Sequence, residues 1–186
     1  MTISKPHLTL VTNLALATVG STIAYLTNWI IIIPILFGLG IPLVNIDKPL
    51  KYKAGLTLVI VIASLAVFVI AIMTAVSFNF DKYIFPGLVV GISGVLLLGI
   101  NGFLIESVKV NTKTVLVTFL LSGLSLPTWI ILTESILPTT IRDNDVVRQF
   151  GVMLFWMTLT TIGITIGIEN KKPTANKVHN QWRGSV

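Results

Sequence analysis

Long apolar stretches alternate with short polar segments along the whole chain. Most of the stretches are long enough to cross the hydrocarbon core of a bilayer, about 30 Å thick, as an α-helix. The pattern therefore predicts an all-α membrane protein, a bundle of six transmembrane helices followed by a polar, basic tail at residues 169–186. The predicted helices occupy residues 8–27, 29–46, 54–77, 85–105, 114–137 and 146–168. Although Ala15 to Ala17 mimics a signal-peptide cleavage site, the apolar run continues past it, so we expect the first span to be retained.

A row of small residues marks the fourth stretch. Gly87, Gly91 and Gly94 recur at spacings of four and three residues, which places them on one side of an α-helix. A side without bulky side chains lets a neighbouring helix backbone approach closely in lipid. We predict that this side packs against the first helix or against the sixth, where Gly163 and Gly167 form a second small-residue pair.

Prolines interrupt the second and fifth stretches. Pro34 and Pro42 lie in the second, Pro127 lies near the centre of the fifth, and Asn28 is a candidate N-cap before the second. A proline inside a helix frees one carbonyl, which in lipid must face protein or a wet cavity, so both helices are predicted to be kinked or broken. They are the middle helices of two three-helix halves that would insert upside down relative to each other, as in inverted-repeat transporters. The alternative is that membrane helices simply tolerate proline.

The positive charges predict an orientation. With a cytoplasmic N-terminus, ten of the 13 lysines and arginines fall on the cytoplasmic side. This bias follows the positive-inside rule and places both termini in the cytoplasm, so the net charge of +6 reflects membrane topology. The other side carries only Lys82, Arg142 and Arg148. Nucleic-acid binding has no support, because no soluble basic surface exists to carry it.

Hydroxyl and amide side chains at similar depths suggest a path for a small solute or ion. Together with carbonyls freed by the prolines, they could line a narrow channel. The alternative is that Ser and Thr bond the carbonyls of their own helices or hold helices together. The candidate path residues are Pro34, Ser93, Asn101, Ser125, Pro127, Thr128, Thr161 and Glu134, with Thr18 and Thr158 at the same level.

Three acidic features lie at or near the predicted helix ends. Glu134 lies near membrane depth with Arg142 or Arg148 as its candidate partner, and an ionisable residue there is a functional hypothesis by default. The alternative is an interfacial acid that reaches water. Glu106 precedes Lys109 by three residues, a spacing typical of a solvated pair. The run at 143–145 is more typical of a helix N-cap than of a calcium loop.

Composition argues against an enzyme. The chain has no cysteine, and its two histidines, His7 and His179, lie in polar ends, so neither a thiol nucleophile nor a buried metal cluster is expected. The segment from Gly91 to Gly94, GISG, superficially resembles the serine motif of intramembrane rhomboid proteases, which also need a membrane-embedded histidine. We expect no catalytic site, no metal and no cofactor.

Two functions remain open. In the first, the protein is a transporter or channel-type subunit for a small solute or ion, part of a homo-oligomer or a membrane complex, in the bacterial cytoplasmic membrane. In the second, it is a non-catalytic membrane anchor, sensor or regulatory subunit that recruits a cytoplasmic partner. Residues predicted to contact that partner, or anionic lipid, are Lys48, Lys51, Lys53, Lys109, Lys113, Lys171 and Lys172.

Overall fold

A computed structural model describes residues 4–77, 83–136, 138–139 and 145–168 of the chain. Within these residues the protein consists of six α-helices, which confirms the prediction of an all-α protein. The helices are α1 (Lys5–Thr27), α2 (Ile32–Asn45), α3 (Leu50–Ser77), α4 (Ile84–Leu104), α5 (Thr112–Ser135) and α7 (Asp145–Ile166). Four of them, α1, α3, α4 and α5, are long and apolar enough to cross a membrane. The apolar helix α2 and the apolar part of α7, Gly151–Ile166, are shorter.

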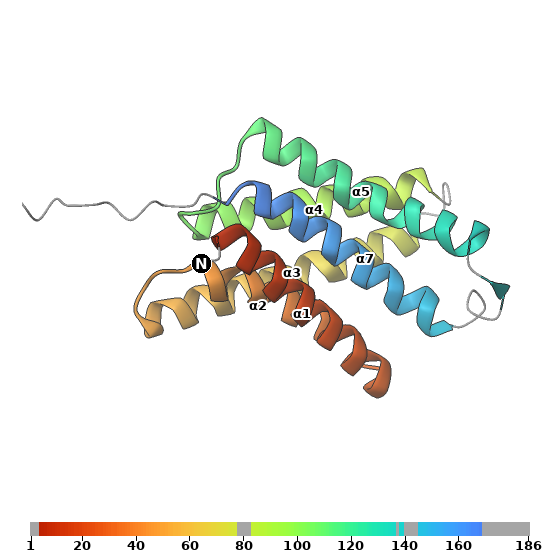
Figure 1. The fold of residues 1–186 in the computed structure, drawn as a ribbon, viewed down its shortest axis with the longest axis horizontal. Coiled ribbons are helices and arrows are strands. Elements are labelled where there is room, and N and C mark those ends of the chain that lie inside the picture. Colours follow the sequence, from red (N-terminus) through yellow and green to blue (C-terminus); the bar gives the residue numbers. More distant parts are fainter. Residues whose placement is uncertain (1–3, 78–82, 137, 140–144, 169–186) are drawn as a thin grey trace, which may run out of the picture.

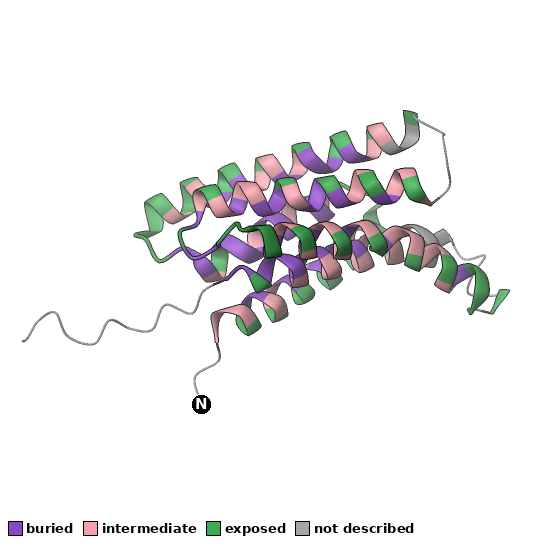
Figure 2. Cartoon of the chain, turned by 90° about the horizontal axis from the view of Figure 1, so that it is seen from above, coloured by how far each residue is buried: buried purple, intermediate pink, exposed green. Residues whose placement is uncertain are grey.

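The helices form a closed ring in chain order. Each helix packs against its neighbour in the sequence, and α7 closes the ring by packing against both α5 and α1 (Figure 1). Buried residues face the inside of the bundle and exposed residues the outside (Figure 2). Many exposed side chains are large and apolar, such as Leu26, Ile70 and Phe103, which is the surface expected of a protein surrounded by lipid.

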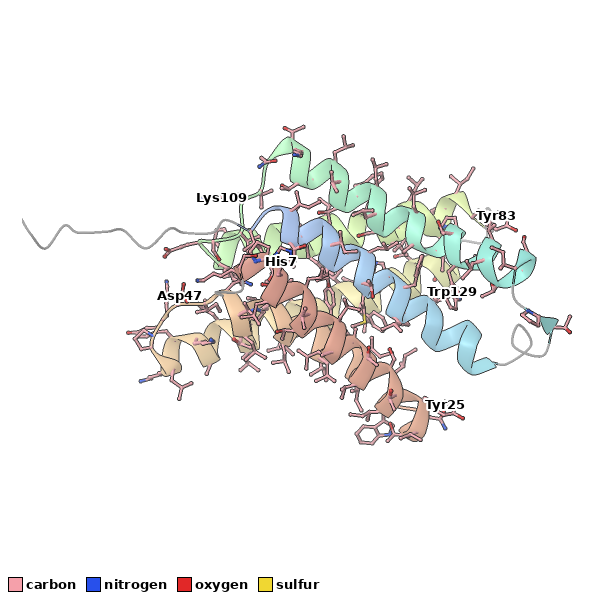
Figure 3. The ribbon with its side chains drawn as sticks, in the orientation of Figure 1. His7, Tyr25, Asp47, Tyr83, Lys109 and Trp129 are labelled. Carbon is pink, nitrogen blue, oxygen red and sulfur yellow. The ribbon has the colours of Figure 1, made fainter. Side chains whose placement is uncertain are left out.

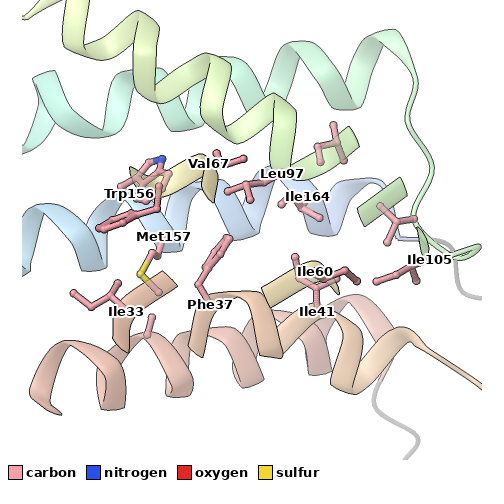
Figure 4. Packing of buried hydrophobic residues seen from close by; sticks show 14 of the residues in the cluster. Ile33, Phe37, Ile41, Ile60, Val67, Leu97, Ile105, Trp156, Met157 and Ile164 are labelled. Atoms are coloured by element: carbon pink, nitrogen blue, oxygen red, sulfur yellow. The ribbon is translucent and has the colours of Figure 1, made fainter. Parts of the chain in front are cut away.

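Large apolar side chains fill the centre of this ring (Figure 4). Trp156 of α7 lies between two phenylalanines, with ring centroids 6.4 Å from Phe37 of α2 and 5.9 Å from Phe68 of α3. Because lipid is as apolar as these side chains, their contribution comes from close van der Waals and aromatic contact. Other members of this core include Ile33, Ile41, Ile60, Leu97, Leu98, Met157 and Ile164, all at most 1% exposed.

The start of α2 differs from the prediction. Asn28 adopts a left-handed conformation with φ of 57° and terminates α1 as its C-cap, so its prediction as the N-cap of α2 is wrong. Asparagine tolerates this region because its short polar side chain can bond locally. Since α2 begins at Ile32, Pro34 lies in its first turn. A backbone N–H in the first turn has no acceptor within the helix, so proline costs no hydrogen bond there. The helix continues through Pro42 to Asn45 without a break, and a kink at this proline stays a prediction.

The helix α5 is also continuous through Pro127, and its predicted break is wrong. A proline at this position leaves the carbonyl of Gly123, four residues earlier, without an N–H partner. That carbonyl faces the backbone of α4, because a Cβ placed on Gly87 would lie 2.9 Å from the Gly123 oxygen. The freed carbonyl is therefore covered by protein, as a water-free environment requires.

The glycine side of α4 is buried against α5. A Cβ on Gly91 would lie 3.0 Å from the ring of Phe119, and a Cβ on Gly94 would lie 2.1 Å from the Ser122 Oγ. The prediction that this side packs on the first or the sixth helix is wrong. Consecutive helices joined by a short connection pack side by side, and α5 offers Ser122 and Gly123, which are small enough for close approach.

The small-residue pair of α7 also faces α5 and the segment before it. A Cβ on Gly163 would lie 2.7 Å from the Thr118 Cα, and a Cβ on Gly167 would lie 2.7 Å from the Lys109 carbonyl oxygen. The backbone N–H of Lys109 also donates a hydrogen bond of 2.8 Å to the backbone carbonyl of Gly167. The helix α5 thus contacts the glycine-bearing side of α4 and that of α7. The hydroxyls of Ser122 in α5 and Thr160 in α7 form a hydrogen bond of 2.9 Å.

Candidate functional site: the lysine-rich end and its buried amides

The fold gathers most described cations at one end of the bundle. This lysine-rich end is formed by the start of α1, the α2–α3 connection, the α4–α5 connection and the end of α7. Figure 3 shows His7, Asp47 and Lys109 there, and Tyr25, Tyr83 and Trp129 toward the opposite end. The lysines of this end are Lys5, Lys48, Lys51, Lys53, Lys109 and Lys113.

Polar contacts tie the segments of the lysine-rich end together. Lys5 pairs with Asp47, and Lys48 Nζ lies 3.6 Å from a carboxylate oxygen of Glu106, a partner that the sequence did not indicate. These pairs link the start of α1 to the α2–α3 connection and that connection to the α4–α5 connection. The Lys48–Glu106 pair is largely exposed, so its expected contribution to stability is at most about 1 kcal/mol.

A cavity of about 100 Å³ opens between the α2–α3 and α4–α5 connections. Its polar lining comes from Asn45, Asp47, Lys48, Glu106 and Ser107. The Ser107 hydroxyl donates to the Asn45 carbonyl at 3.4 Å across it. The volume holds a few water molecules, and its carboxylates and ammonium group suit water or a small ion better than an apolar molecule.

Buried amides lie just inside this end, between α1, α2 and α7. Asn45 Nδ2 donates to Thr9 Oγ1 at 2.8 Å and to the Ile41 carbonyl at 2.9 Å. Asn13 Nδ2 donates to Thr161 Oγ1 at 3.2 Å. All four side chains are at most 3% exposed. Of these four residues, only Thr161 was predicted to line a path. Asn13 and Asn45 each place a single amide within an apolar run, and this is a signal that the sequence contains.

Both of these amides, and that of Asn101 in α4, are only half satisfied. The Oδ1 atoms of Asn13, Asn45 and Asn101 are buried without a hydrogen-bond partner, a situation that costs about 1–3 kcal/mol per group. The Asn13 oxygen occupies the space above Gly40, only 1.3 Å from where a Cβ would be. Only glycine leaves room for this amide, so the Asn13 side chain of α1 packs directly against the backbone of α2 at Gly40.

The candidate path residues lie at separate places in the bundle, some exposed and some buried. Thr18 and Thr128 are exposed on the outside of the bundle. The hydroxyls of Ser93, Ser125 and Thr158 donate to carbonyls of their own helices, those of Val89, Ser122 and Leu154. The amide of Asn101 likewise donates to the Leu97 carbonyl at 2.8 Å. These contacts match the alternative interpretation, in which polar side chains bond within their own helix.

Glu134 lies at the opposite end of α5 and is exposed. Its carboxylate accepts a hydrogen bond from the Tyr83 hydroxyl at 3.3 Å, which joins the end of α5 to the start of α4. Its candidate partner Arg142 lies outside the described part of the protein, as do the side chains of Arg148 and of the run 143–145. The tail with Lys171 and Lys172 also lies outside it.

Among the described residues, no three His, Asp or Glu side chains are grouped so that they could hold a metal ion. No protein-family model matches the chain, and comparison with curated proteins and with solved structures finds no significant match.

Proposed function

We propose that the protein is a non-catalytic membrane module that recruits an acidic cytoplasmic partner at its lysine-rich end. The observation that carries the proposal is the packed apolar centre of the helix ring. Trp156, Phe37 and Phe68 stack there, and fully buried leucines and isoleucines surround them. Such a centre holds the helices in one arrangement, while the polar and charged groups are concentrated at one end, where a soluble partner has access to them.

The proposal includes a topology. All six helices cross the bilayer, both termini are cytoplasmic, and the lysine-rich end faces the cytoplasm of a bacterial cell, in line with the ten-to-three charge bias. With 14 residues, α2 is about 21 Å long, shorter than the hydrocarbon core of about 30 Å. Its neighbours α1 and α3 pack along it and cover it within the bundle.

Charge is the main feature that such a partner would recognise. Lys51 and Lys113 are exposed at the lysine-rich end, and the net charge of the chain is +6. An acidic protein surface is attracted to this end over a range set by the ionic strength, about 8 Å at physiological salt. The module would then act as an anchor or regulatory subunit within a larger membrane complex.

Co-purification from native membranes tests the proposal. Truncation after Asn170 and Lys51→Glu should each reduce recovery of one and the same acidic protein, and raised salt should do so as well. The control is Lys82→Glu, which removes a positive charge predicted to lie on the other side. The proposal fails if recovery of every co-purifying protein is the same in the truncation, in Lys51→Glu and in the control.

A transporter or channel-type subunit, with two inverted halves, is our second proposal. The observation that favours it is the polar cavity at the lysine-rich end, whose lining includes the half-satisfied amide of Asn45. Proteoliposome flux of Na⁺, K⁺ and a small neutral solute such as glycerol tests it, with Asn45→Leu, which removes an amide from the cavity lining, as the variant expected to reduce transport. Full flux in Asn45→Leu would refute a path past this amide, and no flux in the unaltered protein would favour the recruiting module.

A further inference from the structure

Two apolar hollows follow the outer seam between α4 and α5. One, of about 400 Å³, lies between residues 92–96 of α4 and 112–119 of α5, and we name it the lysine-side groove. The other, of about 330 Å³, lies between residues 83–88 and 119–127 and is the opposite groove. Both include Phe119, so they meet there and together run along the α4–α5 pair.

The lysine-side groove has a shape that suits a hydrocarbon chain. Its walls are exposed apolar side chains, among them Leu96 at 51% and Leu116 at 56% exposure. The ring of Phe119, which lies against the bare backbone of Gly91, closes the end toward the middle of the bundle. The volume is in the range of sites that bind small molecules. Water does not fill an apolar hollow at this depth, so an acyl chain is the available occupant.

Charge distinguishes the two grooves. The lysine-side groove opens at Thr112, next to Lys113, and Lys113 lies on the same side of α5 as Leu116 and Leu120, three and seven residues further along. The opposite groove ends at Tyr83, whose hydroxyl donates to the carboxylate of Glu134. An anionic headgroup therefore meets a cation at one groove and a carboxylate at the other.

The dimensions agree with a lipid of one leaflet. From Thr112 to Phe119, α5 rises by about 10 Å. Half of the hydrocarbon core is about 15 Å thick, so an acyl chain that starts at the membrane surface beside Lys113 reaches Phe119 within its own leaflet.

We propose that the lysine-side groove binds an anionic phospholipid, with one acyl chain in the groove and the phosphate next to Lys113. The occupant is a component of the surrounding membrane, so this inference does not depend on the recruitment of a partner. Leu116→Trp, which fills the groove without changing the charge of the lysine-rich end, is expected to leave the co-purification of an acidic protein unchanged, and this keeps the two proposals separable.

Native mass spectrometry of the full chain, released from a neutral detergent with equal amounts of phosphatidylglycerol and phosphatidylcholine, tests the site. The unaltered protein should retain phosphatidylglycerol in preference to phosphatidylcholine. Lys113→Ala should weaken phosphatidylglycerol binding about fivefold, and Lys113→Arg should preserve it. The control is Lys51→Ala, which removes an equally exposed lysine at the start of α3, on the other side of the same end (Figure 1), and should change binding less than twofold.

A second pair of variants tests the acyl-chain part of the site. Leu116→Trp fills the lysine-side groove and should reduce binding of both lipids, whereas Leu124→Trp in the opposite groove should leave the preference for phosphatidylglycerol intact. Equal loss in Lys113→Ala and Lys51→Ala would reduce the effect to general surface charge and overturn the proposal. So would unchanged binding in Leu116→Trp. A dimer mass that Leu116→Trp abolishes would assign the groove to a second copy of the chain instead.

Discussion

Replacing Gly94 by alanine tests how closely α4 and α5 approach. The added Cβ would lie 2.1 Å from the Ser122 Oγ and 2.7 Å from the Ser122 Cβ. Rotation of the Ser122 hydroxyl relieves the first clash but breaks its bond to Thr160, which measures 2.9 Å. The second clash involves an atom fixed to the backbone of α5, so the two helices must separate by about 1 Å to reach ordinary contact.

The magnitude follows from comparison with Gly99→Ala on the same helix, where an added Cβ would meet nothing within 4 Å. Both substitutions gain the same helix propensity, which cancels in the difference. Overpacking costs about 1–3 kcal/mol, and a lost interhelical hydrogen bond in a membrane protein costs about 0.6 kcal/mol on average. Gly94→Ala should therefore be less stable than Gly99→Ala by about 1.5–3.5 kcal/mol.

Thermal unfolding in a mild detergent, followed by circular dichroism, measures this difference. For a chain of this size it corresponds to a melting temperature roughly 5–10 °C lower in Gly94→Ala than in Gly99→Ala. Equal melting temperatures would refute the close contact between α4 and α5. If both variants melted at the same temperature, below that of the unaltered protein, the loss of stability could not be assigned to the contact between α4 and α5.

Two further predictions concern the lysine-rich end. Gly40→Ala should cost about 1–3 kcal/mol in detergent unfolding, because its Cβ would lie 1.3 Å from the Asn13 oxygen and displace the amide from Thr161. Adding Asn13→Ala should restore part of that loss, and simple additivity of the two changes would contradict the contact. Single cysteines at Lys51 and Asn144 of this cysteine-free chain report the orientation: in intact cells an impermeant thiol reagent should label position 144 and not position 51, and the reverse result would invert the topology.

The hydrophobic pattern was sufficient to predict the helices. Apolar runs of this length admit only helices in lipid, because each backbone group must be satisfied within its own segment. The ends were less well determined, as Asn28 shows. A polar residue between two apolar runs can end one helix or begin the next, and only its left-handed conformation decides which. For the same reason Pro34 was assigned to a helix interior, although it lies in a first turn.

Neighbours in space were harder to predict than elements. The glycine side of α4 fits any small surface, and nothing in its spacing selects α5 over α1 or α7. The buried amides show the same limit, since Asn13 and Thr161 are bonded across 148 positions. Depth alone grouped Thr18 and Thr128 with buried hydroxyls, because it does not tell which side of a helix faces lipid.

The closure of the ring by α1 and α7 has a consequence for how the protein is made. At about 5–20 residues per second, roughly 7–30 s separate the synthesis of Asn13 from that of Thr161, its partner 148 positions later. During this interval the α1–α2 hairpin can shelter the Asn13 oxygen over Gly40, but the amide N–H groups remain without their native acceptor. The first helix of the chain is therefore completed last. A chain that stops before α7 leaves this buried amide without the hydroxyl that satisfies it in the finished protein.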